Sequence, residues 1–568
     1  MTQLVLLCDG TNNNLTGLAQ DTHVVLLAEL LRRDPDAGRL VFYDPGVGNP
    51  GQIPGTTLWD KWRRQYQRIE GLAFGGGVYD NIAEGYRFLM QHWREGDAIY
   101  LFGFSRGAFT ARSIAGMVNR FGILAPHQEA MLPTLLHVYF SDINDDALRI
   151  VAQARRLFGA DAARPAGVHF VGVWDTVASV GLWPFDLKFR VAPTLQGKRF
   201  LHVRHALALD EQRAQFKPRL YDQANGSFTT ADGHAGSIEQ LWFRGAHCDV
   251  GGGYALEKSA LARAPLHWLL SQAVQCGLSL HHQGRALADE PAVEAAVAEL
   301  IPALTGGPDP ATAQPLRVHS QFFATALWAL TGMAQRDTRH VDVDGAPDPT
   351  IQPREHASVM QWQAGFPADT EWALARPGAG FWWALALVLL MPLALGQLLL
   401  IPTESAAEWW LQLEVLPANA LAYLLVNADF QWWQLSAWWP GGDWWADATA
   451  FAAPRWAVTW DLLLIGAYAV VLARLATRGF ASATALRRAG DPVSRGLNRL
   501  GWALPLAVFA DLGENLFTWL TLTLGETELW LLAGLTRPAM AACALLKFAG
   551  LAGALWLALG APGLRAKR

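Results

Sequence analysis

The chain has 568 residues, which is enough for several domains of ordinary size, and 52% of its residues are hydrophobic. Its 45 basic and 50 acidic side chains nearly balance, which argues against a surface built to bind nucleic acid. Its four cysteines are too few and too scattered for a disulfide framework or a zinc cluster, and this fits a reducing compartment for the soluble part.

The N-terminal segment is predicted to form a buried parallel strand. Residues 4–8 are continuously apolar and run directly into the polar turn Asp9-Gly10-Thr11. Ligands of open α/β sheets bind at the carboxyl ends of the strands, so Gly10 and Thr11 are candidate backbone donors to an oxyanion. The alternative is a turn that only caps the next helix. The first residues lack a basic segment and a cleavage site, so we expect no signal peptide.

A strand, a sharp turn and a helix are predicted over residues 98–112, with Ser105 at the bend. Gly103 and Gly107 flank this serine in a G-x-S-x-G pattern, and two glycines let the strand and the helix approach closely. Ser105 is therefore the candidate nucleophile, and the backbone N–H of Arg106 is a candidate oxyanion donor. The five-residue pattern alone is as often structural as catalytic, but its strand–turn–helix context favours catalysis.

Two later strand ends supply candidate partners for the serine. Residues 168–174 form a predicted buried strand that ends at Asp175, the candidate acid. Another strand ends at His247, before a glycine-rich loop, and this histidine is the candidate general base. The order Ser105, Asp175, His247 is the one expected after such a turn. The alternatives are a purely structural aspartate that caps its own turn and His205 as the base.

The remainder of the first 375 residues is assigned to the same predicted catalytic domain. Residues 184–240 alternate basic, aromatic and turn residues, and an excursion of that length between two sheet strands is typical of a lid or a substrate wall. Residues 278–375 are rich in Ala, Pro and Gly and are predicted to form the edge of the domain and a linker.

Four sequence blocks carry a resemblance to a known family: Gly103-Phe-Ser-Arg-Gly107, Gly172-Val-Trp-Asp-Thr-Val177, Arg204-His-Ala-Leu-Ala-Leu-Asp-Glu211 and Gly245-Ala-His-Cys-Asp-Val-Gly-Gly-Gly-Tyr254. Together they resemble the catalytic domain of the type VI secretion lipase effectors of the first group. The likeness extends from residue 4 to about residue 268 and, more weakly, to residues 356–359. It implies an α/β-hydrolase fold, with a mostly parallel sheet flanked by helices, and the triad Ser105, Asp175 and His247. Some members are phospholipases A, but the resemblance leaves the substrate open.

Residues 376–568 are predicted to form an all-α membrane domain. Its four apolar stretches have about the length that crosses a bilayer: residues 381–401, 456–475, 502–524 and 538–559. Six arginines between residues 474 and 499 and a basic tail alternate with acidic connecting segments. The positive-inside rule then predicts a multi-pass protein of a bacterial-type inner membrane, with the hydrolase domain in the cytoplasm.

Two polar features of this domain carry further predictions. The loop over residues 404–455 contains four tryptophan pairs and is expected at the outer membrane interface, with a carbohydrate-binding surface as the alternative. Asp511 and Glu514 share one face of the third stretch, and Lys547 lies near the middle of the fourth. Charges there are expected to face inward and pair, or else to line a proton or ligand path.

The sequence as a whole predicts a membrane-anchored serine hydrolase that cleaves carboxylic esters, most plausibly acyl esters of phospholipids or other lipids. In this prediction Ser105 attacks, His247 transfers the proton and Asp175 orients the imidazole. No metal or cofactor is expected, the partners are the lipid substrate and the bilayer, and the oligomeric state stays open. The alternatives are a non-catalytic membrane sensor or binding protein on a hydrolase-like domain and a secreted antibacterial lipase toxin.

Overall fold

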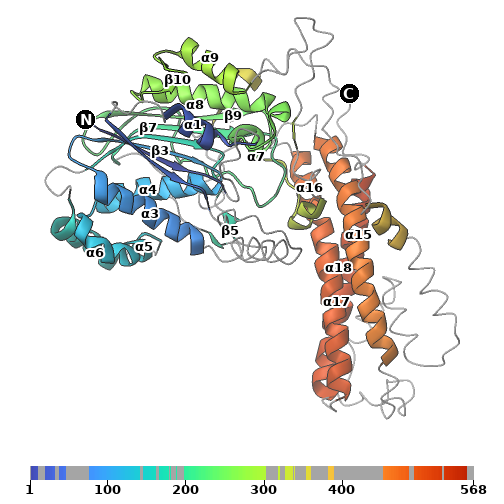
Figure 1. Ribbon diagram of the computed structural model, residues 1–568. Coiled ribbons are helices and arrows are strands. Elements are labelled where there is room, and N and C mark those ends of the chain that lie inside the picture. The colour runs from blue at the N-terminus through green and yellow to red at the C-terminus, as the bar shows by residue number, and fades with distance from the viewer. Residues whose placement is uncertain are drawn as a thin grey trace, which may run out of the picture. The chain divides into compact units, whose positions relative to one another are not determined.

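The chain divides into two compact units in the computed structural model: residues 1–320 with 336–373, and residues 321–335 with 374–568 (Figure 1). The structure describes residues 2–10, 20–31, 38–46, 76–140, 145–160, 166–177, 179–180, 187–188, 198–301, 318–319, 326–336, 338, 353–359, 381–388, 452–484, 492–526 and 530–559. The sequence placed a single boundary near residue 375. The structure differs in giving residues 321–335 to the second unit.

The first unit is built on an eight-stranded, mostly parallel sheet, which agrees with the predicted α/β class. Along its main path every neighbouring pair is parallel, and one further strand, β8 (Gly226–Thr229), pairs antiparallel with β9. The path runs β12 (Arg354–Glu355), β9 (Ala235–Phe243), β7 (Phe200–Ala208), β4 (Val168–Trp174), β3 (Ala98–Phe104), β1 (Gln3–Cys8) and β2 (Arg39–Asp44).

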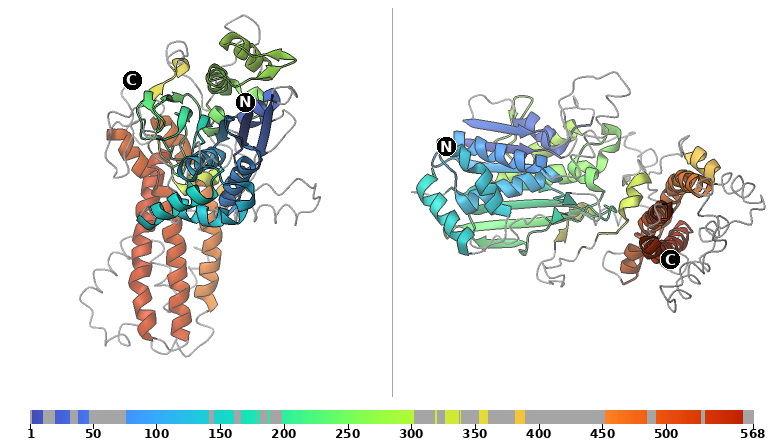
Figure 2. Two further views of the ribbon diagram at one scale, coloured as in Figure 1. Left: turned by 90° about the vertical axis from the view of Figure 1, so that its left-hand side faces the viewer. Right: turned by 90° about the horizontal axis from the view of Figure 1, so that it is seen from below.

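Helices cover both faces of this sheet (Figures 1 and 2). One face carries α3 (Gly76–His92), α4 (Arg106–Phe121), α5 (Leu132–Phe140) and α6 (Asp145–Phe158). The other carries α1 (His23–Leu31), α8 (Arg263–Gln275) and α9 (Glu290–Leu300). The central strand β3 is buried along its whole length and sends alternate side chains into the two cores. A serine placed directly after β3 therefore stands at the middle of the sheet's carboxyl edge.

Strand β7 corrects the prediction of a lid or insertion over residues 184–240, because it lies in the middle of the sheet between β4 and β9. Its sequence mixes apolar residues with His202 and Arg204, which hides the apolar pattern of a buried strand. These polar groups are satisfied inside the fold: His202 Nδ1 lies 2.9 Å from Ser237 Oγ, and Arg204 Nε donates to Gln272 Oε1 at 2.6 Å.

The second unit is helical, and its long helices pack on one another (Figure 1). They are α15 (Ala452–Thr484), α16 (Pro492–Leu500), α17 (Ala503–Glu526) and α18 (Trp530–Ala558). The short 3-10 helix η4 (Ala326–Thr331) packs on the same apolar core. Three of the four predicted membrane stretches fall on α15, α17 and α18. Most of the first stretch, and almost all of the tryptophan-rich loop over residues 404–455, lie outside the described residues.

The prediction of a transmembrane bundle finds no support in this unit. Among the residues that the structure describes, no helix is long and apolar enough to cross a membrane. Polar residues interrupt the apolar runs of all three long helices, including Asp461 in α15, Asp511 and Glu514 in α17 and Lys547 in α18.

The predicted pairing of the charged side chains is confirmed. Lys547 Nζ lies 3.0 Å from Asp511 Oδ1 and 2.8 Å from Glu514 Oε2, and all three residues are at most 5% exposed. Tyr468 also donates to Asp511 Oδ2 at 2.6 Å. A buried charge is tolerated when an opposite charge and hydrogen bonds compensate its desolvation, so this network joins α17 to α18 and α15.

Candidate active site

Ser105 occupies a sharp turn between β3 and α4, as the sequence predicts. Its φ of 59° and ψ of −121° are unusual for a residue with a side chain, and its N–H donates to Trp174 O at 3.0 Å. Strain of this kind persists only where the surrounding structure enforces it. Helix α4 begins at the next residue, so the N–H of Arg106 is one of the donors without a partner inside the helix.

The two glycines beside the serine are required by close backbone contacts. A Cβ atom on Gly103 would lie 2.4 Å from Gly107 O, and one on Gly107 would lie 2.1 Å from Cys8 O and 2.4 Å from Asp9 O. Strand, turn and helix therefore approach one another, and the end of β1, more closely than any larger residue would allow.

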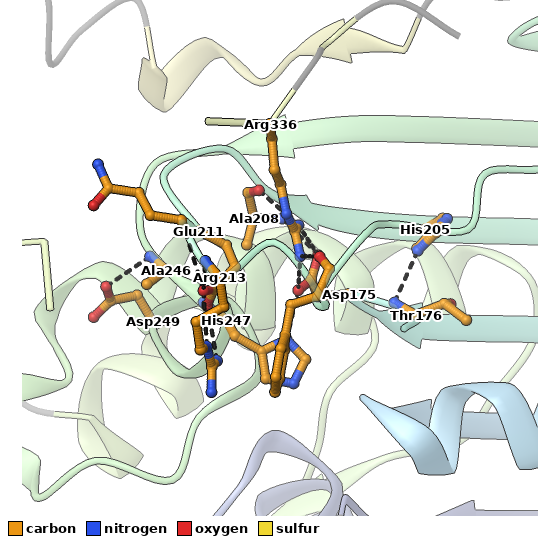
Figure 3. A network of polar contacts seen from close by, with 12 residues as sticks. Asp175, Thr176, His205, Ala208, Glu211, Arg213, Ala246, His247, Asp249 and Arg336 are labelled. Carbon is orange, nitrogen blue, oxygen red and sulfur yellow. Dashed lines mark hydrogen bonds and ion pairs between the residues drawn. The ribbon is translucent and has the colours of Figure 1, made fainter. Parts of the chain in front are cut away.

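Asp175 and His247 come together at the same edge of the sheet (Figure 3). Asp175 follows β4 with a φ of 43° and is fully buried. His247 begins the short helix α7 (His247–Gly251), and its Nδ1 lies 2.5 Å from Asp175 Oδ2. The second ring nitrogen, Nε2, is buried and has no hydrogen-bond partner among the described residues. An imidazole held through Nδ1 with a free Nε2 is arranged to accept a proton.

Packing brings this imidazole next to the serine turn. The ring of Phe104, the residue before Ser105, lies 4.6 Å from the ring of His247, centroid to centroid. Gly251 at the end of α7 approaches the same phenylalanine so closely that a Cβ there would lie 1.9 Å from its ring. Phe216 meets the histidine edge-on, with ring centroids 5.0 Å apart. Aromatic rings thus enclose His247 and limit its contact with water.

A buried ion pair between Glu211 and Arg213 contacts the backbone of His247 (Figure 3). Glu211 accepts the backbone N–H of His247 at 3.1 Å. Both of its oxygens bind Arg213, at 2.8 Å from Nε and 2.9 Å from Nη2. Burial raises the pKa of Glu211, but the adjacent guanidinium outweighs burial and lowers the pKa to about 2. The carboxylate therefore stays ionised and continues to accept the N–H of His247 at the start of α7.

His205, the alternative base, has a structural role. It lies within β7 rather than at its end and is fully buried. Its Nε2 accepts the N–H of Thr176 at 3.2 Å, and its Nδ1 contacts Gln240 Oε1 at 3.3 Å. Burial lowers the pKa of His205 to about 3, which keeps the ring neutral in this position.

Only the start of the predicted oxyanion loop, Asp9 and Gly10, lies within the described residues. The N–H of Gly10 donates to Asp9 Oδ1 at 2.7 Å and is therefore already occupied, while Thr11 lies outside the described residues. Asp9 also accepts Thr22 Oγ1 at 2.8 Å and the Tyr43 hydroxyl at 3.0 Å. The aspartate of this turn thus ties β1 to β2 and α1, a role that local sequence does not reveal.

A residue outside the predicted set completes the environment of the acid. Both terminal nitrogens of Arg336 contact the carboxylate of Asp175: Nη2 lies 2.9 Å from Oδ2, and Nη1 contacts Oδ1 (Figure 3). Burial raises the pKa of Asp175, but the guanidinium and then the imidazole hold the pKa well below its usual range. The contacting residues are 161 positions apart, so sequence spacing gave no signal of this pair.

A second histidine–aspartate pair lies close in sequence to His247. Asp249 is fully buried and accepts from the N–H of Ala246 and of His319, each at 2.9 Å. Its other oxygen lies 2.8 Å from His319 Nδ1. These bonds fix the first turn of α7, and the two with His319 join residues 70 positions apart, which sequence spacing does not reveal.

These features define an α/β protein with a strained serine turn and a buried histidine–carboxylate pair at the carboxyl edge of its sheet. Residues 2–272 match the family model described as the catalytic domain of Tle1-like phospholipase effectors of the type VI secretion system. This match supports a hydrolase of the lipase type for the first unit.

Two individual proteins are similar to parts of the chain. The uncharacterized protein YEL023C of Saccharomyces cerevisiae is 34% identical over 224 residues, which cover 38% of this chain. The matched part is 32% of the yeast protein, so this chain spans about a third of that relative's length. A crystal structure of an uncharacterized protein from Pseudomonas aeruginosa covers 72% of this chain and 60% of that chain, at 16% identity and a TM-score of 0.28. That likeness is too weak to support a conclusion.

Proposed function

We propose that the protein is a serine hydrolase that cleaves acyl esters of lipids at Ser105. The observation that carries the proposal is the buried pair of His247 and Asp175, with a free Nε2, beside a serine held in a strained turn. This constellation suits nucleophilic catalysis, because the histidine can take the serine proton while the carboxylate fixes its tautomer.

The proposed reaction proceeds in two halves. Ser105 Oγ attacks the ester carbonyl carbon and gives its proton to His247 Nε2, while the carbonyl oxygen becomes an oxyanion that the N–H of Arg106 stabilises. Collapse of the tetrahedral intermediate breaks the C–O bond of the ester, and the leaving alcohol takes the proton from His247. Water then attacks the acyl-serine by the same route and releases the fatty acid. Thr11 is proposed as a second oxyanion donor, whereas Gly10 is not, since its N–H is occupied.

A lipid substrate is supported by the family match and by the second unit. Helix α17 exposes a stripe of large apolar side chains at helical spacing: Leu506, Phe509, Leu512, Leu516 and Trp519, each at least 38% exposed. Its charged residues point the other way, into the buried network with Lys547. An apolar outer stripe over a polar interior suits contact with lipid. We therefore propose that this unit anchors the protein to a membrane, with the hydrolase unit on the cytoplasmic side.

The decisive experiment uses the full chain and phospholipid vesicles of defined acyl composition. Wild type should release free fatty acid and lysophospholipid, measured by mass spectrometry, and should sediment with the vesicles. Ser105→Ala should sediment equally but lose at least about 10³-fold in rate, because no other group can form the acyl intermediate. Ser271→Ala, which changes a buried serine of α8 without a hydrogen-bond partner among the described residues, is the matched control and should keep the wild-type rate.

Equal hydrolysis by wild type and Ser105→Ala would contradict the proposed chemistry. Binding to vesicles without turnover in either protein would instead favour a non-catalytic sensor on a hydrolase-like domain. Failure of both proteins to sediment would contradict the proposed lipid contact of the second unit.

A further inference from the structure

Arg336 is a residue of the first unit that directly follows, in the sequence, a segment of the helical unit. Residues 321–335 belong to the helical unit and Arg336 to the unit that holds the sheet. It also lies 64 positions beyond the end of the family match at residue 272. The catalytic carboxylate is therefore neutralised by a side chain from outside the matched catalytic domain.

Each terminal nitrogen of the Arg336 guanidinium makes two contacts, one with Asp175 and one with a backbone carbonyl. Nη1 contacts Asp175 Oδ1 and also donates to Ala208 O at 2.7 Å. Nη2 contacts Asp175 Oδ2 and also donates to Phe216 O at 2.7 Å. The N–H of Ala208 in turn donates to Asp175 Oδ1 at 3.0 Å. Arg336 is 5% exposed, so its planar fork sets the plane of the carboxylate without competition from bulk water.

The residues just before Arg336 make their hydrogen bonds within the helical unit. The N–H of Gln335 donates to Asn498 Oδ1 at 2.7 Å, and Asn498 Nδ2 donates back to Gln335 O at 3.0 Å. Met333 N donates to Gly501 O at 3.1 Å.

We propose that Arg336 is a positioning residue for hydrolysis at Ser105, acting through Asp175: it keeps the carboxylate ionised and oriented so that the carboxylate holds the Nδ1–H of His247. The inference rests on the proposed function. A fully buried carboxylate that lacks its cation becomes protonated or rotates, and in either case it releases the imidazole. Arg336 contacts neither substrate nor the serine in this account.

Several charged or titratable groups surround the ion pair of Arg336 and Asp175, and each affects how activity depends on pH. His247, His205 and Cys248 act electrostatically with Asp175, and Glu211 and Arg213 act with His247. Removal of Arg336 leaves all of these in place. It raises the pKa of Asp175, and it lets the uncompensated carboxylate raise the pKa of His247. Since activity needs an ionised Asp175 and a neutral His247, both changes move the acidic limb of the profile to higher pH.

The test compares kcat, KM and pH profiles of the full chain carrying Arg336→Met or Arg336→Lys. For Arg336→Met we expect kcat to fall about 10²-fold, with KM little changed and the acidic limb of kcat/KM at higher pH. Millimolar guanidinium should restore part of the rate. Arg336→Lys should lose rate because it cannot form the fork, yet keep the wild-type acidic limb because it keeps the charge. Arg199→Met, which breaks a partly exposed ion pair with Asp232, is the matched control.

The outcomes separate this inference from the function on which it rests. A wild type without turnover would contradict the proposed function itself. An active wild type whose Arg336→Met variant keeps the wild-type kcat and acidic limb would overturn the positioning role. A lower kcat in both Arg336 variants with an unmoved acidic limb and no response to guanidinium would also overturn it, since a purely structural role predicts that pattern. Circular dichroism of each variant identifies misfolding, and the Lys variant keeps the test decisive if the Met variant does not fold.

Discussion

Replacing Asp175 by asparagine should lower kcat by about 10⁴-fold while KM changes little. The asparagine amide can donate a hydrogen bond to His247 Nδ1, which would leave the proton on Nε2, the nitrogen that must accept the serine proton. The substitution also removes the negative charge that pairs with Arg336. A buried cation without its partner typically destabilises a fold by about 3–5 kcal/mol. Steady-state kinetics on vesicles and chemical denaturation measure the two effects separately.

The matched control for Asp175→Asn is Asp232→Asn. Asp232 also pairs with an arginine, Arg199, but its side chain is 42% exposed. Neither kcat nor stability should change measurably there. A kcat for Asp175→Asn within tenfold of wild type, on a folded protein, would show that this carboxylate does not set the tautomer of the histidine.

Gly107→Ala should destabilise the first unit by about 3 kcal/mol. The added Cβ would lie 2.1 Å from Cys8 O and 2.4 Å from Asp9 O, and these are backbone atoms at the end of β1, which pairs with a strand on each side. They cannot move without distorting β1 and the serine turn together. The free energy of unfolding, from denaturant titration followed by far-UV circular dichroism, measures the effect.

Gly167→Ala provides the comparison for this glycine. A Cβ at that position meets only ordinary van der Waals contacts, the nearest atom being Arg199 O at 3.4 Å. We expect its free energy of unfolding to stay within about 0.5 kcal/mol of wild type. If both substitutions had the same small effect, the close approach of α4 to β1 would not be a requirement of the fold.

The serine turn and its strand could be predicted because their signals are local. Strand β3 is continuously apolar, and the glycine spacing around Ser105 reports the tight turn directly. The parallel sheet then brings the carboxyl ends of β3, β4 and the end of β9 to one edge. This is why Ser105, Asp175 and His247 could be proposed together from their positions near strand ends and their order along the chain, in agreement with the family resemblance.

The parts that escaped prediction depend on long-range contacts. Strand β7 contains polar residues whose partners, Ser237 and Gln272, come from other elements, so its pattern is not that of a buried strand. Arg336 lies in the range assigned from sequence to the edge of the domain and a linker, and it contacts Asp175 across 161 positions. The helices of the second unit looked like membrane spans because apolar length is visible in a sequence. The sequence predicted only that the isolated charges of these helices need partners, and the contact between Lys547 and Asp511 required the structure.

The claim that Ser105 is the nucleophile is tested most directly by a covalent probe. A fluorophosphonate reacts with an activated serine by displacement of fluoride and leaves a phosphonyl group on Oγ. Wild type should gain the mass of a single phosphonyl group, and peptide mapping should place it on Ser105, while Ser105→Ala and His247→Gln should gain none. An adduct on another residue, or equal labelling of wild type and Ser105→Ala, would contradict the account.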